Sequence, residues 1–403
     1  MESAKSRFLR YVTYYTTSDE FTGTSPSTER QKDLGRALMQ ELEALKLEDV
    51  HMDDCGNVLA TLPASEGVDA PVIALIAHMD TAPDASGENV KPRLVRYEGG
   101  ELKLNDTVSL TEALCPGLES HVGEELIVTD GTTLLGADDK AGVAEIMAAV
   151  ETMIEKNVKH GEVRVIFTTD EEIGNGVDGL DVQELGCDYG YTVDGGPLGE
   201  IEFENFNAAS AVLTVHGVGV HPGSAKNVMI NAATAAMAFH AMLPEDEVPE
   251  KTDGYEGFFH LTDMSGTVEK AMLSYIIRDH IAASFDQRIK TMEHIEKLIN
   301  EKYGEGTAKL TVRQQYRNMR ELIGEHMEIV ELAERALRRE GIEPVTAPVR
   351  GGTDGSQLTF RGLLCPNIGT GGYSCHGPYE HITAEHLETS ANIVLNIIDE
   401  NLK

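Results

Sequence analysis

The chain has 403 residues, of which 41% are apolar, and these values predict large packed cores in two domains rather than disorder. Asp and Glu outnumber Lys and Arg by 68 to 33, a net charge of −35 that disfavours binding to nucleic acid or to anionic membranes. The longest apolar run, residues 71–77, is too short to cross a bilayer, and the charged N-terminus is unlike a signal peptide. We therefore expect a cytoplasmic protein.

The five cysteines are widely spaced, and no two of them form a C-x-x-C unit. This pattern predicts reduced thiols rather than a disulfide framework or a thiolate zinc site. A metal ion in this protein would therefore be bound by His and carboxylate side chains.

Strands that alternate with helices over the first 200 residues or so predict an α/β fold with a mostly parallel sheet flanked by helices. The first helix is expected after residues 26–28, with leucines at helical spacing from Leu34 to Leu45. A second helix, with Val143 to Ile154 on one face, follows a Gly-rich turn. The β-type segments are residues 71–77, 134–135, 163–167 and 189–193.

A smaller domain is expected to be inserted between two parts of this sheet domain. Its predicted strands are residues 211–215, 272–277 and 309–313, with another near 265–269, and its predicted helices are 231–243 and 285–303. This order suits a small α+β domain. We therefore assign residues 1–206 and 318–403 to the larger domain and 207–317 to the inserted lid domain.

Acidic or His residues follow each of the four β-type segments in the larger domain. In open parallel sheets the carboxyl ends of the strands meet at one edge, so these side chains should converge there. So many carboxylates cannot all stay ionised together unless a cation neutralises them, which predicts one or two divalent metal ions. The residues are His78, Asp80, Asp138, Asp139, Asp170, Glu171, Glu172 and Asp194.

The motifs around these residues resemble those of the dinuclear zinc exopeptidases and deacylases, and are most similar to the bacterial aminotripeptidases in that family. The resemblance runs over nearly the whole chain. It is carried by residues 78–81, 136–142, 170–174, 192–196, 202–210, 221–223, 275–279, 350–355 and 370–373.

The resemblance implies two zinc ions per subunit. His78, Asp138 and Asp194 would bind one ion, and Asp138, Glu172 and His376 the other, with Asp138 as the bridge. His nitrogen and carboxylate oxygen are ordinary zinc ligands. A cis peptide bond between Asp138 and Asp139 is also implied.

Three further residues receive catalytic roles from the resemblance. Asp80 would orient the imidazole of His78, although a helix cap is the alternative. Glu171 would be the general base; we expect it to lie with Glu172 on an extended segment, where neighbours point in opposite directions. His221 would stabilise the oxyanion of the tetrahedral intermediate. Without the resemblance, His221 would be interpreted as a loop residue.

Arg278 and Arg350 are candidates for binding the terminal carboxylate of a peptide, since Arg forms bidentate pairs with carboxylates. For Arg350 a surface ion pair is an equal alternative. Because His221 and Arg278 lie in the inserted domain, we expect the two domains to close during catalysis, with hinges near residues 207 and 317.

The segment from Ser374 to His381 departs from the aminotripeptidase pattern, which leaves the shape of the pocket beside His376 open. His381 and His386 follow at five-residue steps, which fit neither one helical face nor the family pattern, and they receive no role here.

The resulting hypothesis is a zinc-dependent aminopeptidase that releases the N-terminal residue from tripeptides. Its substrates would be short peptides. A dipeptidase or an N-acyl amino acid deacylase with the same chemistry is the alternative, and a catalytically silent relative is disfavoured by Glu171 and His221. Side-chain preference, the physiological metal and the oligomeric state stay open, with a homodimer among the options.

Overall fold

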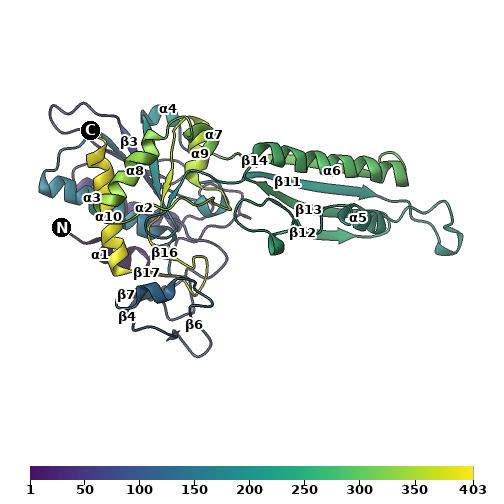
Figure 1. Ribbon diagram of the computed structural model, residues 1–403, viewed down its shortest axis with the longest axis horizontal. Helices are drawn as coiled ribbons and strands as arrows, with labels where there is room; N and C mark the ends of the chain where they lie inside the picture. The colour runs from purple at the N-terminus through teal and green to yellow at the C-terminus, as the bar shows by residue number, and fades with distance from the viewer. Residues whose placement is uncertain (403) are drawn as a thin grey trace. The chain divides into compact units, whose positions relative to one another are not determined.

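The computed structural model describes residues 1–402, which form two compact units. The first unit consists of Met1–Phe203, Glu321–Ala347 and Thr353–Lys403, and the second of Glu204–Arg320 and Pro348–Gly352. Figure 1 shows both units coloured by residue number.

The main sheet of the first unit combines parallel and antiparallel strands. Its four central strands, β8, β3, β9 and β15, are parallel, while β1, β2 and β10 add antiparallel pairs at the two edges. The predicted fold class is confirmed. In sheet order the strands are β1 (Glu48–Met52), β2 (Val58–Leu62), β8 (Val163–Thr168), β3 (Ile73–His78), β9 (Tyr189–Val193), β15 (Asn367–Ile368) and β10 (Ile201–Glu202).

Helices cover this sheet and explain why β3 is buried at every position. Ala74 and Ile76 of β3 pack in one apolar cluster with Leu185 of α4 and Leu358 of α9, and α3 also contacts β3. Helices α1, α3, α10 and α8 pack in succession beside one another (Figure 1). The helices are α1 (Ala4–Tyr11), α2 (Gln31–Ala44), α3 (Ala137–Lys156), α4 (Val182–Leu185), α7 (Arg320–Ile323), α8 (Glu328–Arg339), α9 (Asp354–Arg361) and α10 (Ala384–Glu400).

A glycine allows the beginning of α3 to approach the end of β9 closely. A Cβ on Gly142 would lie 1.9 Å from the carbonyl oxygen of Val193, so only glycine fits at this position. The contact places the first turn of α3 beside Asp194, the residue after β9.

A second, small antiparallel sheet in the first unit was not expected from the sequence. Its strands are too short to show a clear period in the sequence. In order they are β16 (Gly372–Tyr373), β17 (His381–Thr383), β7 (Glu125–Val128) and β4 (Arg93–Arg96), and β5 (Leu102–Lys103) pairs separately with β6 (Ser109–Leu110).

The second unit is a four-stranded antiparallel sheet with helices α5 (Ala232–His240) and α6 (Ala282–Tyr303) packed against it in one apolar core. The further strand predicted near residues 265–269 is present as β12 but lies earlier and ends at Gly266, because the chain turns at Thr267, where the backbone N–H bonds to the carbonyl oxygen of Lys270. The strands are β12 (Phe258–Gly266), β13 (Lys270–Asp279), β11 (Asn207–His216) and β14 (Ala308–Tyr316).

The segment Pro348–Gly352 belongs to the second unit, whereas the prediction assigned it to the larger domain. Its backbone pairs with this unit through a bridge between Val349 and Asn205, and Arg350 donates hydrogen bonds to the carbonyl oxygens of Gly254 and Glu256. Contacts of this kind, between segments far apart in the chain, leave no periodic signal in the sequence.

Within the residues that the structure describes, no helix is long and apolar enough to cross a membrane.

Candidate metal centre

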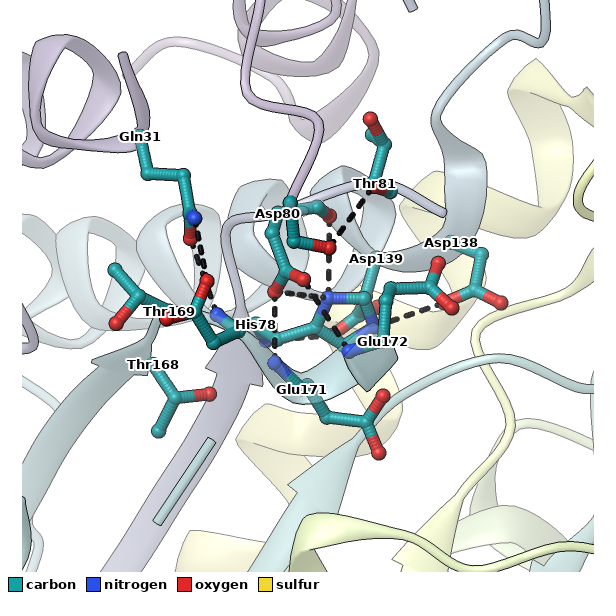
Figure 2. A network of polar contacts seen from close by, with 12 residues as sticks. Gln31, His78, Asp80, Thr81, Asp138, Asp139, Thr168, Thr169, Glu171 and Glu172 are labelled. Carbon is teal, nitrogen blue, oxygen red and sulfur yellow. Dashed lines mark hydrogen bonds and ion pairs between the residues drawn. The ribbon is translucent and has the colours of Figure 1, made fainter. Parts of the chain in front are cut away.

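The acidic and His residues predicted to converge do so at the carboxyl ends of three adjacent strands. His78 is the last residue of β3, Asp194 follows β9, and the acidic segment 170–172 follows β8. Asp138 comes from the beginning of α3, and residues 134–135 before it, predicted as a β-type segment, form no strand. Figure 2 shows His78 between Asp80 and Asp138, with Glu172 close by.

The carboxylate of Asp138 lies between two imidazoles. Its Oδ1 is 2.9 Å from Nε2 of His78, and its Oδ2 is 3.3 Å from Nε2 of His376. Asp194 completes the first group, 3.5 Å from His78 Nε2, and Glu172 completes the second, 3.0 Å from His376 Nε2. The peptide bond between Asp138 and Asp139 is cis, as the resemblance implied.

These two groups offer the donors of a pair of divalent ions that share one carboxylate. Each group contains one imidazole nitrogen and carboxylate oxygens, which are ordinary zinc ligands. Oε1 of Glu172 is buried and has no hydrogen-bond partner among the described residues, as expected for an atom whose partner is an ion. The residues present therefore fit a dinuclear metal site.

Electrostatics at this centre favour a bound cation. Burial raises the pKa of Asp194, and it raises the pKa of Glu172 to about 7. Burial also opposes ionisation of Asp138, but its hydrogen bonds to His376 and His78 outweigh that effect and lower its pKa. Positive charge next to these groups would keep them ionised.

Asp80 holds both His78 and the acidic segment after β8. Nδ1 of His78, opposite the nitrogen that faces Asp138, lies 3.2 Å from the backbone carbonyl oxygen of Asp80 and 3.3 Å from its carboxylate Oδ1. The same carboxylate accepts hydrogen bonds from the backbone N–H groups of Glu171 (3.0 Å) and Glu172 (3.2 Å). Asp80 is fully buried. The contact with His78 suits the orienting role. The bonds from Glu171 and Glu172, which begin a 3₁₀ helix, suit the alternative of a helix cap, so the role of Asp80 stays a prediction.

Asp80→Ala is expected to lower the affinity for metal by a factor of about 10–100, because His78 loses the carboxylate that orients its ring. Metal affinity can be measured by competition with a coloured zinc chelator, with Asp84→Ala as the matched control. Asp84 is more exposed (66%) and lies 3.8 Å from His376. Equal affinities in all three proteins would show that Asp80 does not orient His78.

Glu171 and Glu172 do not lie on an extended segment, so that part of the prediction is wrong. They begin the short 3₁₀ helix η2 (Glu171–Ile173), which follows Asp170 in a left-handed conformation. Consecutive residues of a 3₁₀ helix are separated by a third of a turn, so the two carboxylates still point in different directions (Figure 2). Burial raises the pKa of Glu171 well above its ordinary value.

Two buried carboxylates that received no role from the sequence support this centre. Asp139 accepts hydrogen bonds from the backbone N–H of His78 and of Gly142, both at 3.1 Å. Glu380 accepts three, from Leu135 (2.6 Å), Gly136 (2.8 Å) and Asp138 (3.1 Å). Both therefore fix the backbone that carries metal ligands. The sequence shows only that Asp139 and Glu380 are acidic residues, and this does not reveal which backbone N–H groups they bind.

The remaining predicted residues lie in the second unit. His221 is exposed, and its Nδ1 accepts a hydrogen bond from the backbone N–H of Gly223 (3.1 Å), which places the proton of the neutral ring on Nε2. Arg278 donates to the carbonyl oxygens of Ala209 and Ile277 and lies over the ring of Tyr316.

The contacts of Arg350 differ from the surface ion pair that was the alternative to substrate binding. Its guanidinium donates to carbonyl oxygens of residues 252, 254 and 256 and lies over the rings of Phe206 and Phe258. Substrate binding by Arg350, like the roles of His221 and Arg278, stays a prediction.

A mixed α/β sheet whose strand ends present two His and carboxylate groups joined by one shared carboxylate is typical of dinuclear metal-dependent hydrolases. Peptidase T from Clostridium perfringens is 50% identical to this chain over 400 residues, which cover 99% of this chain and 98% of the relative. Peptidase T from Alkaliphilus oremlandii is 48% identical, over 99% of both chains. The chain therefore belongs to the peptidase T family, and the predicted class of hydrolase is confirmed.

Solved structures agree with this assignment. The aminopeptidase PepT from Bacillus cereus matches with a TM-score of 0.79 and 26% identity, covering 100% of this chain and 98% of the other. A Bacillus subtilis protein described as a dinuclear metal binding peptidase from the M20 family shares the fold, with a TM-score of 0.65 and 17% identity, covering 98% and 97% of the two chains. Residues 203–307 match the family described as Peptidase dimerisation domain.

Proposed function

We propose that this protein releases the N-terminal residue from tripeptides and that its cofactor is a pair of zinc ions. The observation that carries the proposal is the Asp138 carboxylate, whose two oxygens face His78 and His376 from opposite sides. Zinc suits this site, because imidazole nitrogen and carboxylate oxygen are its usual ligands in catalytic centres. The ions, when bound, would supply positive charge that makes water more acidic and a peptide carbonyl more electrophilic.

Residues of the chain would carry out the proton transfers and position the groups that react. Glu171 would take a proton from the attacking water and return it to the leaving amine. Asp80 would hold the His78 ring and the backbone of η2 in place. His221, whose neutral ring carries its proton on Nε2, would be able to donate a hydrogen bond to an oxyanion.

A comparison of three substrates tests this proposal. The purified, zinc-loaded protein should hydrolyse a tripeptide much faster than the same tripeptide with an acetylated N-terminus, and faster than a dipeptide. Equal rates on the blocked and free tripeptides would contradict an aminopeptidase and favour a deacylase. A preference for the dipeptide would favour a dipeptidase, and no turnover of any substrate would indicate a silent relative.

Arg278→Ala is expected to raise KM strongly for a tripeptide but to change it little for the corresponding tripeptide amide. The reason is that the amide lacks the carboxylate that Arg278 would bind. Steady-state kinetics on both substrates give the result, with Arg313→Ala, another arginine of the same sheet, as a control. If both substrates lose affinity equally, Arg278 serves only its contacts with Tyr316 and neighbouring carbonyl oxygens.

Two broader predictions accompany the proposal. The match of residues 203–307 to a peptidase dimerisation domain supports a homodimer, which analytical ultracentrifugation would detect. All five cysteines, which lie within the described residues, are free, and this supports a reducing compartment such as the cytoplasm.

A further inference from the structure

A second group of potential metal ligands lies in the first unit, apart from the candidate metal centre. It consists of His121, Glu124 and His386, called the His121 cluster below. His121 ends the 3₁₀ helix η1 (Leu118–His121), Glu124 directly precedes β7, and His386 lies in the first turn of α10. The group thus joins two neighbouring elements, η1 and β7, to α10, which lies far along the chain.

The distances in the His121 cluster are those of a site that could close around one ion. Oε2 of Glu124 is 2.9 Å from Nδ1 of His121 and 3.8 Å from Nε2 of His386. One ligand atom from each residue lies within 4.8 Å of the other two. Donors placed about 2 Å from one zinc ion lie roughly 3.3 Å apart in a tetrahedron. The pairs in the candidate metal centre, 2.9–3.5 Å apart, provide a comparison within the same chain.

His121 is buried and His386 half-buried, and each ring has one buried nitrogen without a hydrogen bond to the described residues. His121 is 3% exposed, and its Nε2 has no hydrogen-bond partner among the described residues. Nδ1 of His386 likewise has no hydrogen-bond partner among the described residues. Nε2 of His386 lies 3.8 Å from Glu124, which is too far for a hydrogen bond. The nitrogens that face Glu124 are the other two, Nδ1 of His121 and Nε2 of His386, and they share this one carboxylate. An ion beside Glu124 would bind these two nitrogens, and Nε2 of His386 would gain a closer partner than the carboxylate at 3.8 Å.

The protonation and access of these groups also suit a metal ion. Burial lowers the pKa of His386, which favours the neutral ring that metal ions bind. The side chain of Glu124 is 30% exposed, which leaves a path for the ion and room for a water molecule as a further ligand.

We propose that His121, Glu124 and His386 bind a divalent ion of the zinc type, in addition to the ions of the candidate metal centre. This ion would join η1 and the beginning of β7 to α10. The ring of His121 also contacts the ring of Tyr373 in β16, at 4.8 Å between centroids. Since His376 follows Tyr373 by three residues, the ion would stabilise the strand that leads to a catalytic metal ligand.

The number of zinc ions per chain tests this proposal without relying on enzyme activity. After equilibration in a zinc buffer and removal of excess metal, Glu124→Gln and His386→Gln should each contain one ion fewer than the wild-type chain. His381→Gln is the matched control, because His381 belongs to the same group of rings but its Nδ1 already lies 2.9 Å from the carbonyl oxygen of Tyr379. The control should lose no ion.

Counting zinc ions per chain in a Glu172→Gln background shows from which of the two metal sites an ion is lost. Adding Glu124→Gln to that background should again remove one ion, because the two sites are independent. The proposal is overturned if Glu124→Gln and His386→Gln both keep the wild-type count. It is also overturned if the loss disappears in the Glu172→Gln background, since the lost ion would then belong to the candidate metal centre.

Discussion

Glu171→Gln is expected to lower kcat for a tripeptide by a factor of about 10²–10⁴ while leaving the metal content unchanged. The amide of Gln has almost the same shape as the carboxylate, but it cannot accept a proton from water. The backbone of residue 171 is held by Asp80 through its N–H group, so the substitution should leave η2 in place. Steady-state kinetics and elemental analysis of the same preparation measure both quantities.

Glu172→Gln is the matched comparison, because it makes the same chemical change one residue further along the chain. Glu172 faces His376 at 3.0 Å and has a buried oxygen with no hydrogen-bond partner in the part of the chain that the structure describes, so this variant should lose metal as well as activity. If both variants contain equally little metal, the proposal that Glu171 is the base and Glu172 a metal ligand is wrong. Full activity of Glu171→Gln would remove this residue from the mechanism.

Glu380→Ala is expected to lower the free energy of unfolding by several kcal/mol and to weaken metal binding. Glu380 is 1% exposed and accepts hydrogen bonds from the backbone N–H groups of Leu135, Gly136 and Asp138. Each N–H group left buried without a partner costs about 1–3 kcal/mol. The loop before α3 would then relax, and the Asp138 carboxylate would move away from the two imidazoles. Urea unfolding followed by circular dichroism measures the loss of stability.

Glu112→Ala is a suitable control for Glu380→Ala. Glu112 also accepts two backbone hydrogen bonds, from Gly117 and Glu119, but it is exposed, so water can replace it. Its substitution should change the free energy of unfolding by less than about 0.5 kcal/mol. Equal effects of the two substitutions would show that the loop before α3 does not depend on Glu380.

The sequence predicted part of the candidate metal centre, because His78, Asp194 and the acidic segment 170–172 follow buried strands. Short apolar segments such as residues 73–78 and 189–193 are readily recognised, and the residues after them meet wherever the strands are parallel and adjacent. The ligand sets themselves came from the family resemblance. Composition and spacing alone predicted only that a cation is needed.

Several features could not be predicted, because they depend on the path of the backbone. Glu380 stabilises the loop before α3 from a position more than two hundred residues away, and an acidic residue in a sequence does not reveal its backbone partners. Arg350 contacts carbonyl oxygens of the second unit, because the segment 348–352 that contains it belongs to that unit. His386 received no role because its spacing from His376 fits no helical face, yet the fold brings it to His121 and Glu124.

Anomalous diffraction at the zinc edge, from crystals of the zinc-loaded protein, tests the central claim most directly. Our account predicts two peaks separated by the carboxylate of Asp138, one next to His78 and Asp194 and the other next to Glu172 and His376. The account would be contradicted by a single peak at this centre, or by ions that contact neither Asp138 nor His376.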